Sequence, residues 1–64
     1  MNRFGENLKQ ARTEMGINQK QFAEMLQTTQ QRVSEWERGV IEPTLSNIVK
    51  IIKVLGISLE ELID

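Results

Sequence analysis

The chain has 64 residues, a formal net charge of −1, and neither cysteine nor histidine. A chain of this length has room for one small domain and buries only about 60% of its unfolded surface. The missing cysteines and histidines exclude disulfides, the usual zinc ligands and Ser-His or Cys-His catalytic pairs. No apolar stretch approaches the ~20 residues of a membrane span, and Met1 leads into polar residues. We therefore expect one soluble domain, residues 1–64, without a metal, a cofactor or a membrane partner.

The charges are distributed unevenly along the chain. Residues 1–38 hold six basic and five acidic side chains, whereas residues 39–64 hold two basic and four acidic ones. A net charge near zero argues against a strongly electrostatic nucleic-acid binder, because such domains are usually basic. Any surface that faces an anion should therefore lie in the first part.

The first segment has the spacing of an amphipathic α-helix. Its apolar residues recur at i, i+4, i+7 and i+11, namely at Phe4, Leu8, Ala11 and Met15. This pattern predicts a helix from about residue 2 to residue 15, with Asn2 able to cap its start. Gly5 weakens the first turn by roughly 0.5–1 kcal/mol relative to alanine.

Two short helices that meet at a tight turn are predicted next. Asn18 is a good N-cap for the second helix, with a glutamine three residues on as its capping-box partner, and this helix runs to about Leu26. The third helix opens at Thr28 or Thr29, and Thr29 is the better N-cap if Gln30 is the first helical residue. The third helix ends at Arg38, because a glycine follows.

The second half of the chain predicts two more helices. Thr44 caps a fourth helix, which is the most apolar segment of the chain and ends at Gly56. Ser58 and Glu61 form a capping box for a short fifth helix. No segment alternates with period two, so we expect an all-α domain of five helices without a sheet.

Over essentially its full length the chain resembles the helix-turn-helix domains of the Cro/repressor type, the XRE family typified by lambdoid phage repressors. The residues that carry the resemblance are Gln19-x-x-x-Ala23, Val33-Ser34-x-Trp36-Glu37-Arg38-Gly39 and Glu-Pro-Thr-Leu at 42–45. The resemblance implies a five-helix, lambda-repressor-like fold whose second and third helices form the helix-turn-helix. Asn18-Gln19 and Thr28-Thr29-Gln30-Gln31 look like the phage repressor subgroup, whose glutamines at these positions read bases.

Three residues of the third helix are candidates for contacts with bases. Gln30 and Gln31 lie in its first turn, which reaches base edges in this motif. A glutamine amide donates and accepts at once, and adenine is its favoured bidentate partner. Glu35, one turn after Gln31, can accept from cytosine N4, or it is a charge that disfavours wrong sequences. The alternative for both glutamines is a pair of solvated amides on a polar helix face.

Six further residues are candidates for contacts with DNA phosphates. The first turns of the second and third helices present free N–H groups and a positive dipole end, which suit a phosphate. The candidates are Gln19, Thr29, Arg38, Asn18, Lys20 and Arg32. Family resemblance makes Arg38 the best placed of the basic side chains, whereas Asn18 is mainly a cap.

The family pattern also predicts structural features around the recognition helix. Arg12 and Glu37 stand where the family commonly forms an ion pair between the first helix and the end of the third. Gln27 stands where the family usually has a glycine, so we expect a non-glycine residue at positive φ. Residues 40–42 replace a loop that is often basic in relatives. We therefore expect modest affinity for DNA and a shallow salt dependence.

The leading hypothesis is a sequence-specific, DNA-binding transcriptional regulator that places residues 30–37 in the major groove. We expect a repressor from the cytoplasm of a bacterium or encoded by a phage or prophage. One monomer covers only a few base pairs, so specificity implies a homodimer on a palindromic operator, with half-sites about 34–36 Å apart. The apolar residues expected near a dimer surface are Ile41, Leu59, Leu62 and Ile63. For Leu59 and Leu62, closure of the core is at least an equal alternative.

The rival hypothesis is a protein-interaction module, an antitoxin-like or adaptor domain on the same fold. The near-neutral charge and the non-basic loop favour it, whereas the outward glutamines count against it. The fold alone does not decide between the two, because one scaffold can host either use. An enzyme is a distant third, because the chain has no histidine, no cysteine and no glycine-rich phosphate loop, and we expect no small-molecule substrate.

Overall fold

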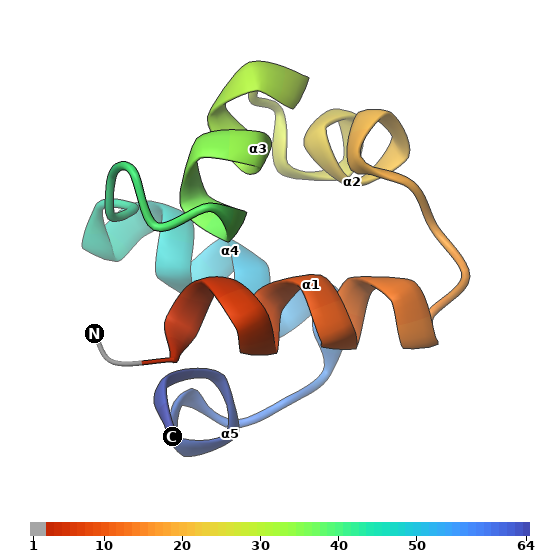
Figure 1. Ribbon diagram of the computed structural model, residues 1–64. Helices are drawn as coiled ribbons and strands as arrows, with labels where there is room; N and C mark the ends of the chain where they lie inside the picture. The colour runs from red at the N-terminus through yellow and green to blue at the C-terminus, as the bar shows by residue number, and fades with distance from the viewer. Residues whose placement is uncertain (1–2) are drawn as a thin grey trace.

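The computed structural model describes residues 3–64, which form five α-helices and no strand. The helices are α1 (Phe4–Glu14), α2 (Gln19–Leu26), α3 (Gln30–Glu37), α4 (Leu45–Leu55) and α5 (Leu59–Ile63). In Figure 1, α2 and α3 lie together at one end, α5 lies at the opposite end, and α1 crosses between them. None of these helices is long and apolar enough to span a bilayer. The all-α, five-helix prediction is confirmed.

Side-chain caps fix where the last four helices begin, at the residues predicted from the sequence. Asn18 accepts a hydrogen bond from the backbone N–H of Gln21 (2.7 Å), and the Gln21 side chain accepts one from the Asn18 N–H (2.8 Å). Ser58 and Glu61 form the same capping box at α5, and Thr29 and Thr44 each accept from the N–H three residues on. Each such cap contributes on the order of 1 kcal/mol.

The start of α1 differs from the sequence prediction. Asn2, the predicted cap, lies outside the described residues, and Arg3 holds the N-cap position without a side-chain hydrogen bond. The sequence predicts only a weakened first turn at Gly5. In the structure, a Cβ atom at Gly5 would collide with the carbonyl oxygen of Glu37 and lie 2.8 Å from that of Trp36. Gly5 is therefore a packing residue, because it lets α1 approach the end of α3.

The turn between α2 and α3 contains the predicted strained residue. Gln27 has φ 59° and ψ 44°, and no other non-glycine residue in the described part of the chain has a positive φ. This conformation lets the Thr28 N–H donate to the Ala23 carbonyl (2.9 Å), which also accepts from the Gln27 N–H at the end of α2. The cost for a residue with a Cβ is about 1 kcal/mol.

The core lies where the helices converge, and every helix contributes to it. Its buried members are Phe4, Leu8, Phe22, Ala23, Leu26, Val33, Trp36, Ile51, Leu55 and Leu62. Of the two alternatives for α5, core closure is confirmed for Leu62, which is fully buried, whereas Leu59 stays exposed. Asn7 also donates its side-chain N–H to the Leu62 carbonyl (3.0 Å), which ties α5 to α1.

Candidate nucleic-acid interface

The outward face of α3 carries the residues predicted to contact bases. Val33 and Trp36 are buried and fix which side of α3 meets the core. With 3.6 residues per turn, Gln31 and Glu35 fall on the opposite side of the helix, one turn apart. Gln30 and Gln31 are exposed, and within residues 3–64 their amides have no hydrogen-bond partner. The structure thus brings Gln31 and Glu35 together, with Gln30 in the first turn.

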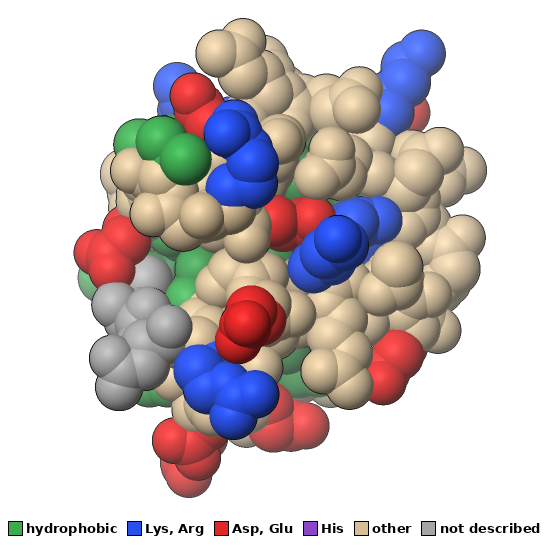
Figure 2. Space-filling model, viewed as in Figure 1, with side chains coloured by type: hydrophobic (Ala, Val, Ile, Leu, Met, Phe, Trp, Pro, Cys, Tyr) green, Lys and Arg blue, Asp and Glu red, His purple; other side chains and the backbone are tan. Residues whose placement is uncertain are grey.

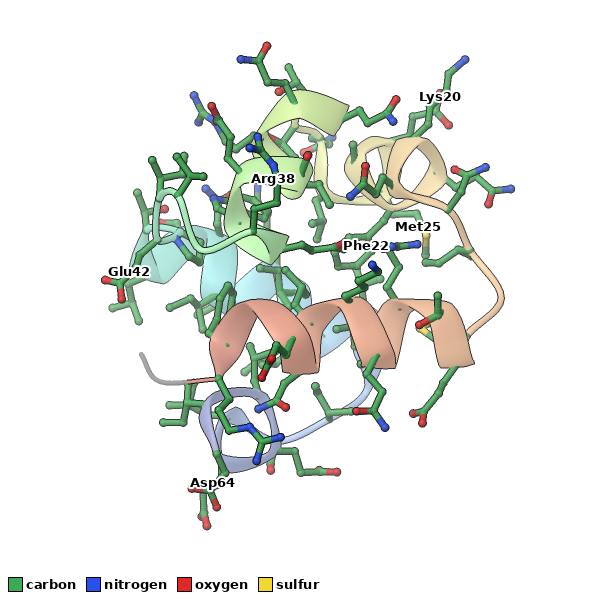
Figure 3. All side chains as sticks on the ribbon, in the orientation of Figure 1. Lys20, Phe22, Met25, Arg38, Glu42 and Asp64 are labelled. Atoms are coloured by element: carbon green, nitrogen blue, oxygen red, sulfur yellow. The ribbon has the colours of Figure 1, made fainter. Side chains whose placement is uncertain are left out.

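Arg38 follows the last residue of α3 and is held along the helix. Its Nε–H donates to the hydroxyl oxygen of Ser34, one turn earlier, at 3.2 Å. The guanidinium remains exposed and keeps its Nη groups for another acceptor. In Figure 3, Arg38 lies against α3, whereas Lys20 extends from the outer end of α2 into solvent. These two cations therefore flank the exposed face of the two helices.

The first turns of α2 and α3 keep hydrogen-bond donors for a phosphate. At each helix only the third N–H is accepted by the cap, so the N–H groups of the first two residues point outward. The cap residues Asn18 and Thr29 use an oxygen as acceptor, and their own side-chain hydrogens remain available. The two helix starts, with their positive dipole ends, each suit one backbone phosphate.

Gln19, whose contact with a phosphate stays a prediction, also makes a hydrogen bond within the protein. Its Nε2 donates to Oε1 of Glu37 at 3.1 Å, so one amide hydrogen points into the protein. Sequence reasoning missed this hydrogen bond, because it joins the start of α2 to the end of α3. The second amide hydrogen and the backbone N–H of Gln19 remain for a ligand.

The ion pair between Arg12 and Glu37 is confirmed and is almost completely buried. The Arg12 Nε donates to Glu37 Oε2 at 2.6 Å, and Nη2 donates to Oε1 at 3.1 Å. The side chains of the two residues are only 8% and 3% exposed. Arg12 Nη1 also donates to the carbonyl of Ile17 at 2.8 Å. One carboxylate therefore links α1, the start of α2 and the end of α3, and it holds the start of α2 against the end of α3.

Charge on this molecule is mixed in sign. Figure 2 shows Lys and Arg side chains interspersed with Asp and Glu on the viewed face, without a large basic area. Around α3, the exposed cations Lys20, Arg32 and Arg38 accompany the half-buried Glu35. In residues 3–64 no three His, Cys, Asp or Glu side chains gather in a way that could hold a metal ion. The surface thus offers directed hydrogen bonds and only a few positive charges.

Comparison with known proteins gives consistent matches. A family model described as Helix-turn-helix matches residues 8–62. The SPbeta prophage-derived uncharacterized HTH-type transcriptional regulator YonR of Bacillus subtilis is 38% identical over 60 residues, which are 94% of this chain and 56% of that protein. The HTH-type transcriptional activator BcrR of Enterococcus faecalis is 33% identical over 61 residues, or 95% of this chain and 30% of that protein. The HTH-type transcriptional regulator PuuR of Escherichia coli is 33% identical over 57 residues, which are 89% of this chain and 31% of that protein.

The chain spans about half the length of the first of these relatives and about a third of the other two. No solved structure matches it.

Proposed function

Because the chain belongs to the XRE-type helix-turn-helix family, we propose that it is a sequence-specific, DNA-binding transcriptional regulator that inserts α3 into the major groove. The observation that carries this proposal is the pair of exposed, unpartnered amides of Gln30 and Gln31 in the first turn of α3. These amides can read the N6 and N7 edge of adenine, and Glu35 can accept from cytosine N4. Relatives named as transcriptional regulators support the same function.

Contacts to the DNA backbone then set the register of α3 in the groove. The starts of α2 and α3, with Asn18 and Thr29, would each approach a phosphate, and Gln19 would donate its second amide hydrogen. Lys20, Arg32 and Arg38 are the cations available on this side. If each neutralises one phosphate, log K falls with log salt with a slope of about −3 per protomer. This dependence of affinity on salt is shallow for a DNA-binding protein.

Two finer features belong to the proposal. The protein binds a palindromic operator as a homodimer, because one α3 reads too few bases for useful specificity, and the half-sites lie about 34–36 Å apart. It represses transcription by occupying DNA that polymerase needs, a mode that requires no contact beyond the operator. A reporter gene placed behind the operator tests this, because repression lowers expression and the activation named for one relative raises it.

The proposal is tested by titrating labelled duplexes with the protein and its Gln31→Ala variant. Loss of one base-reading amide should weaken the preferred site by about 1–3 kcal/mol and leave binding to random duplex nearly unchanged. Gln10→Ala, an exposed glutamine on α1, is the matched control and should change neither affinity. A Gln31→Ala variant that binds every duplex as the parent does would contradict the assigned role of α3.

A protein-interaction module of the antitoxin or adaptor kind is the second candidate. The specific observation in its favour is the exposure of large apolar side chains in and after the α3–α4 loop, including Val40 and Leu45. A titration against random duplex at low salt separates the two functions, since a DNA-binding protein keeps salt-sensitive, non-specific affinity. Absence of any such affinity in folded protein would favour the second candidate.

A further inference from the structure

A hydroxyl and a guanidinium meet at the end of the recognition helix. The Oγ of Ser34 accepts a hydrogen bond from the Arg38 Nε–H at 3.2 Å, and the Ser34 carbonyl accepts one from the Arg38 backbone N–H at 3.0 Å. In Figure 3 the Arg38 side chain lies along α3, whereas Lys20 extends away from α2. Ser34 therefore holds both the backbone and the side chain of Arg38.

Among the residues that the structure describes, no carboxylate pairs with this guanidinium. The arginines that form ion pairs there are Arg3 and Arg12. Because Ser34 takes the Nε–H of Arg38, the N–H groups at the end of the guanidinium, on its two Nη atoms, are left for a ligand. That end of the side chain matches two oxygens of one phosphate.

The hydroxyl hydrogen of Ser34 also has no acceptor within residues 3–64. A hydroxyl on a helix often donates to a carbonyl three or four residues earlier, as Thr13 on α1 does to the carbonyls of Lys9 and Gln10. Ser34 is half-buried and uses its oxygen as an acceptor instead. Its hydrogen is therefore available to a ligand that lies beside the guanidinium of Arg38.

We propose that Ser34 and Arg38 together form a clamp for one phosphate of the DNA backbone, with Nη hydrogens of Arg38 and the hydroxyl hydrogen of Ser34 as donors. The clamp rests on the proposed function, because its phosphate belongs to DNA that α3 binds. Ser34 also acts as a positioning residue, since a guanidinium that is already ordered loses less rotamer freedom on binding. The other candidate phosphate contacts include the starts of α2 and α3, so the clamp fixes α3 in the groove from its opposite end.

The clamp is tested first without DNA, by nitrogen–proton NMR of arginine side chains. The Arg38 Nε–H should exchange with water more slowly than that of Arg32, an exposed arginine of α3 whose side chain has no hydrogen bond within residues 3–64. Ser34→Ala should raise the Arg38 exchange rate to that of Arg32, and Ser34→Thr, which keeps the hydroxyl, should preserve the slow exchange. Equal Arg38 rates in the parent and in Ser34→Ala would overturn the proposal.

Titration of labelled duplexes then measures what the clamp contributes to binding. Ser34→Ala should weaken binding to the preferred site and to random duplex by the same factor, roughly two- to tenfold, because a phosphate contact carries no sequence information. Alanine is a good helix former, so this variant stays folded. Arg38→Ala should make the salt slope shallower by about 1, whereas Ser34→Ala keeps the charge and should leave the slope nearly unchanged. Ser34→Thr should restore binding.

A double variant shows that the two residues act as one unit. Most of the loss caused by Ser34→Ala should disappear when Arg38 is already replaced by alanine, and all of it should remain when Arg32 is replaced instead. If the parent binds DNA and Ser34→Ala binds every duplex equally well, or if its effect adds to that of Arg38→Ala, the clamp is overturned and the proposed function stands. A folded parent protein that binds no duplex would overturn both.

Discussion

Replacing Glu37 by leucine should destabilise the protein severely, because it strands the buried guanidinium of Arg12. The carboxylate accepts two hydrogen bonds from Arg12, at 2.6 and 3.1 Å, and the Arg12 side chain is only 8% exposed. Breaking such a pair by removing one partner costs about 3–5 kcal/mol. At about 0.05–0.15 kcal/mol per residue, a chain of this length has a total stability of roughly 3–10 kcal/mol. The single variant should therefore lose a third or more of its stability.

The double variant, Arg12→Met with Glu37→Leu, separates the cost of a buried unpaired charge from the other contributions to the loss of stability. Arg12→Met alone leaves the carboxylate with only Gln19 as partner and also removes the donor to the Ile17 carbonyl. When both partners are replaced, no charge is buried, and the half-exposed Gln19 amide can turn to water. We expect the double variant to be more stable than the sum of the single effects predicts, with a coupling energy of at least about 2 kcal/mol.

Urea unfolding followed by tryptophan fluorescence measures this cycle directly. Trp36 is the only tryptophan in the chain and is buried beside the end of α3. If a single variant is unfolded in water, an osmolyte titration that restores folding gives its stability relative to the parent. A loss of unfolding free energy below about 1 kcal/mol for Glu37→Leu would refute the reasoning. So would single-variant effects that add to the double-variant effect within about 0.5 kcal/mol.

Three further substitutions test local features of the fold. Gln27→Gly should raise the melting temperature by about 4–8 °C, because it relieves about 1 kcal/mol of strain at φ 59°. Thermal unfolding followed by circular dichroism measures this, and an unchanged melting temperature would contradict the strain. Gly5→Ala should lower the free energy of unfolding in urea by about 1–3 kcal/mol despite the better helix propensity of alanine, because its Cβ meets the carbonyls of Glu37 and Trp36. A gain in stability would show that α1 and α3 can move apart without cost. Thr29→Ala should cost about 0.5–2 kcal/mol by removing the cap of α3, and equal stability in the same assay would show that the cap is dispensable.

Features governed by local sequence were predicted well. The capping boxes at Asn18 and Ser58 depend on residues three positions apart, so the sequence alone predicts where α2 and α5 begin. The positive φ of Gln27 and the pairing of Arg12 with Glu37 were implied by the family resemblance, and both are confirmed. The roles of individual residues at DNA remain predictions.

Other features that depend on contacts between helices were not predicted. The collision that a side chain at Gly5 would cause and the hydrogen bond from Gln19 to Glu37 both join segments distant in sequence. Periodicity predicts an apolar face on α4 but does not show which part of that face the other helices cover. Leu45 and Val49 therefore emerge as exposed only once α4 is placed in the fold.

Selection of bound duplexes from a randomised DNA pool at low salt tests the central claim most directly. Reading of bases by α3 predicts an enriched two-fold sequence with a fixed spacing between its half-sites, and loss of that enrichment in a Gln30→Ala, Gln31→Ala double variant. Trp36 fluorescence establishes that each protein is folded. A folded parent protein that enriches no sequence would contradict the claim that α3 reads DNA.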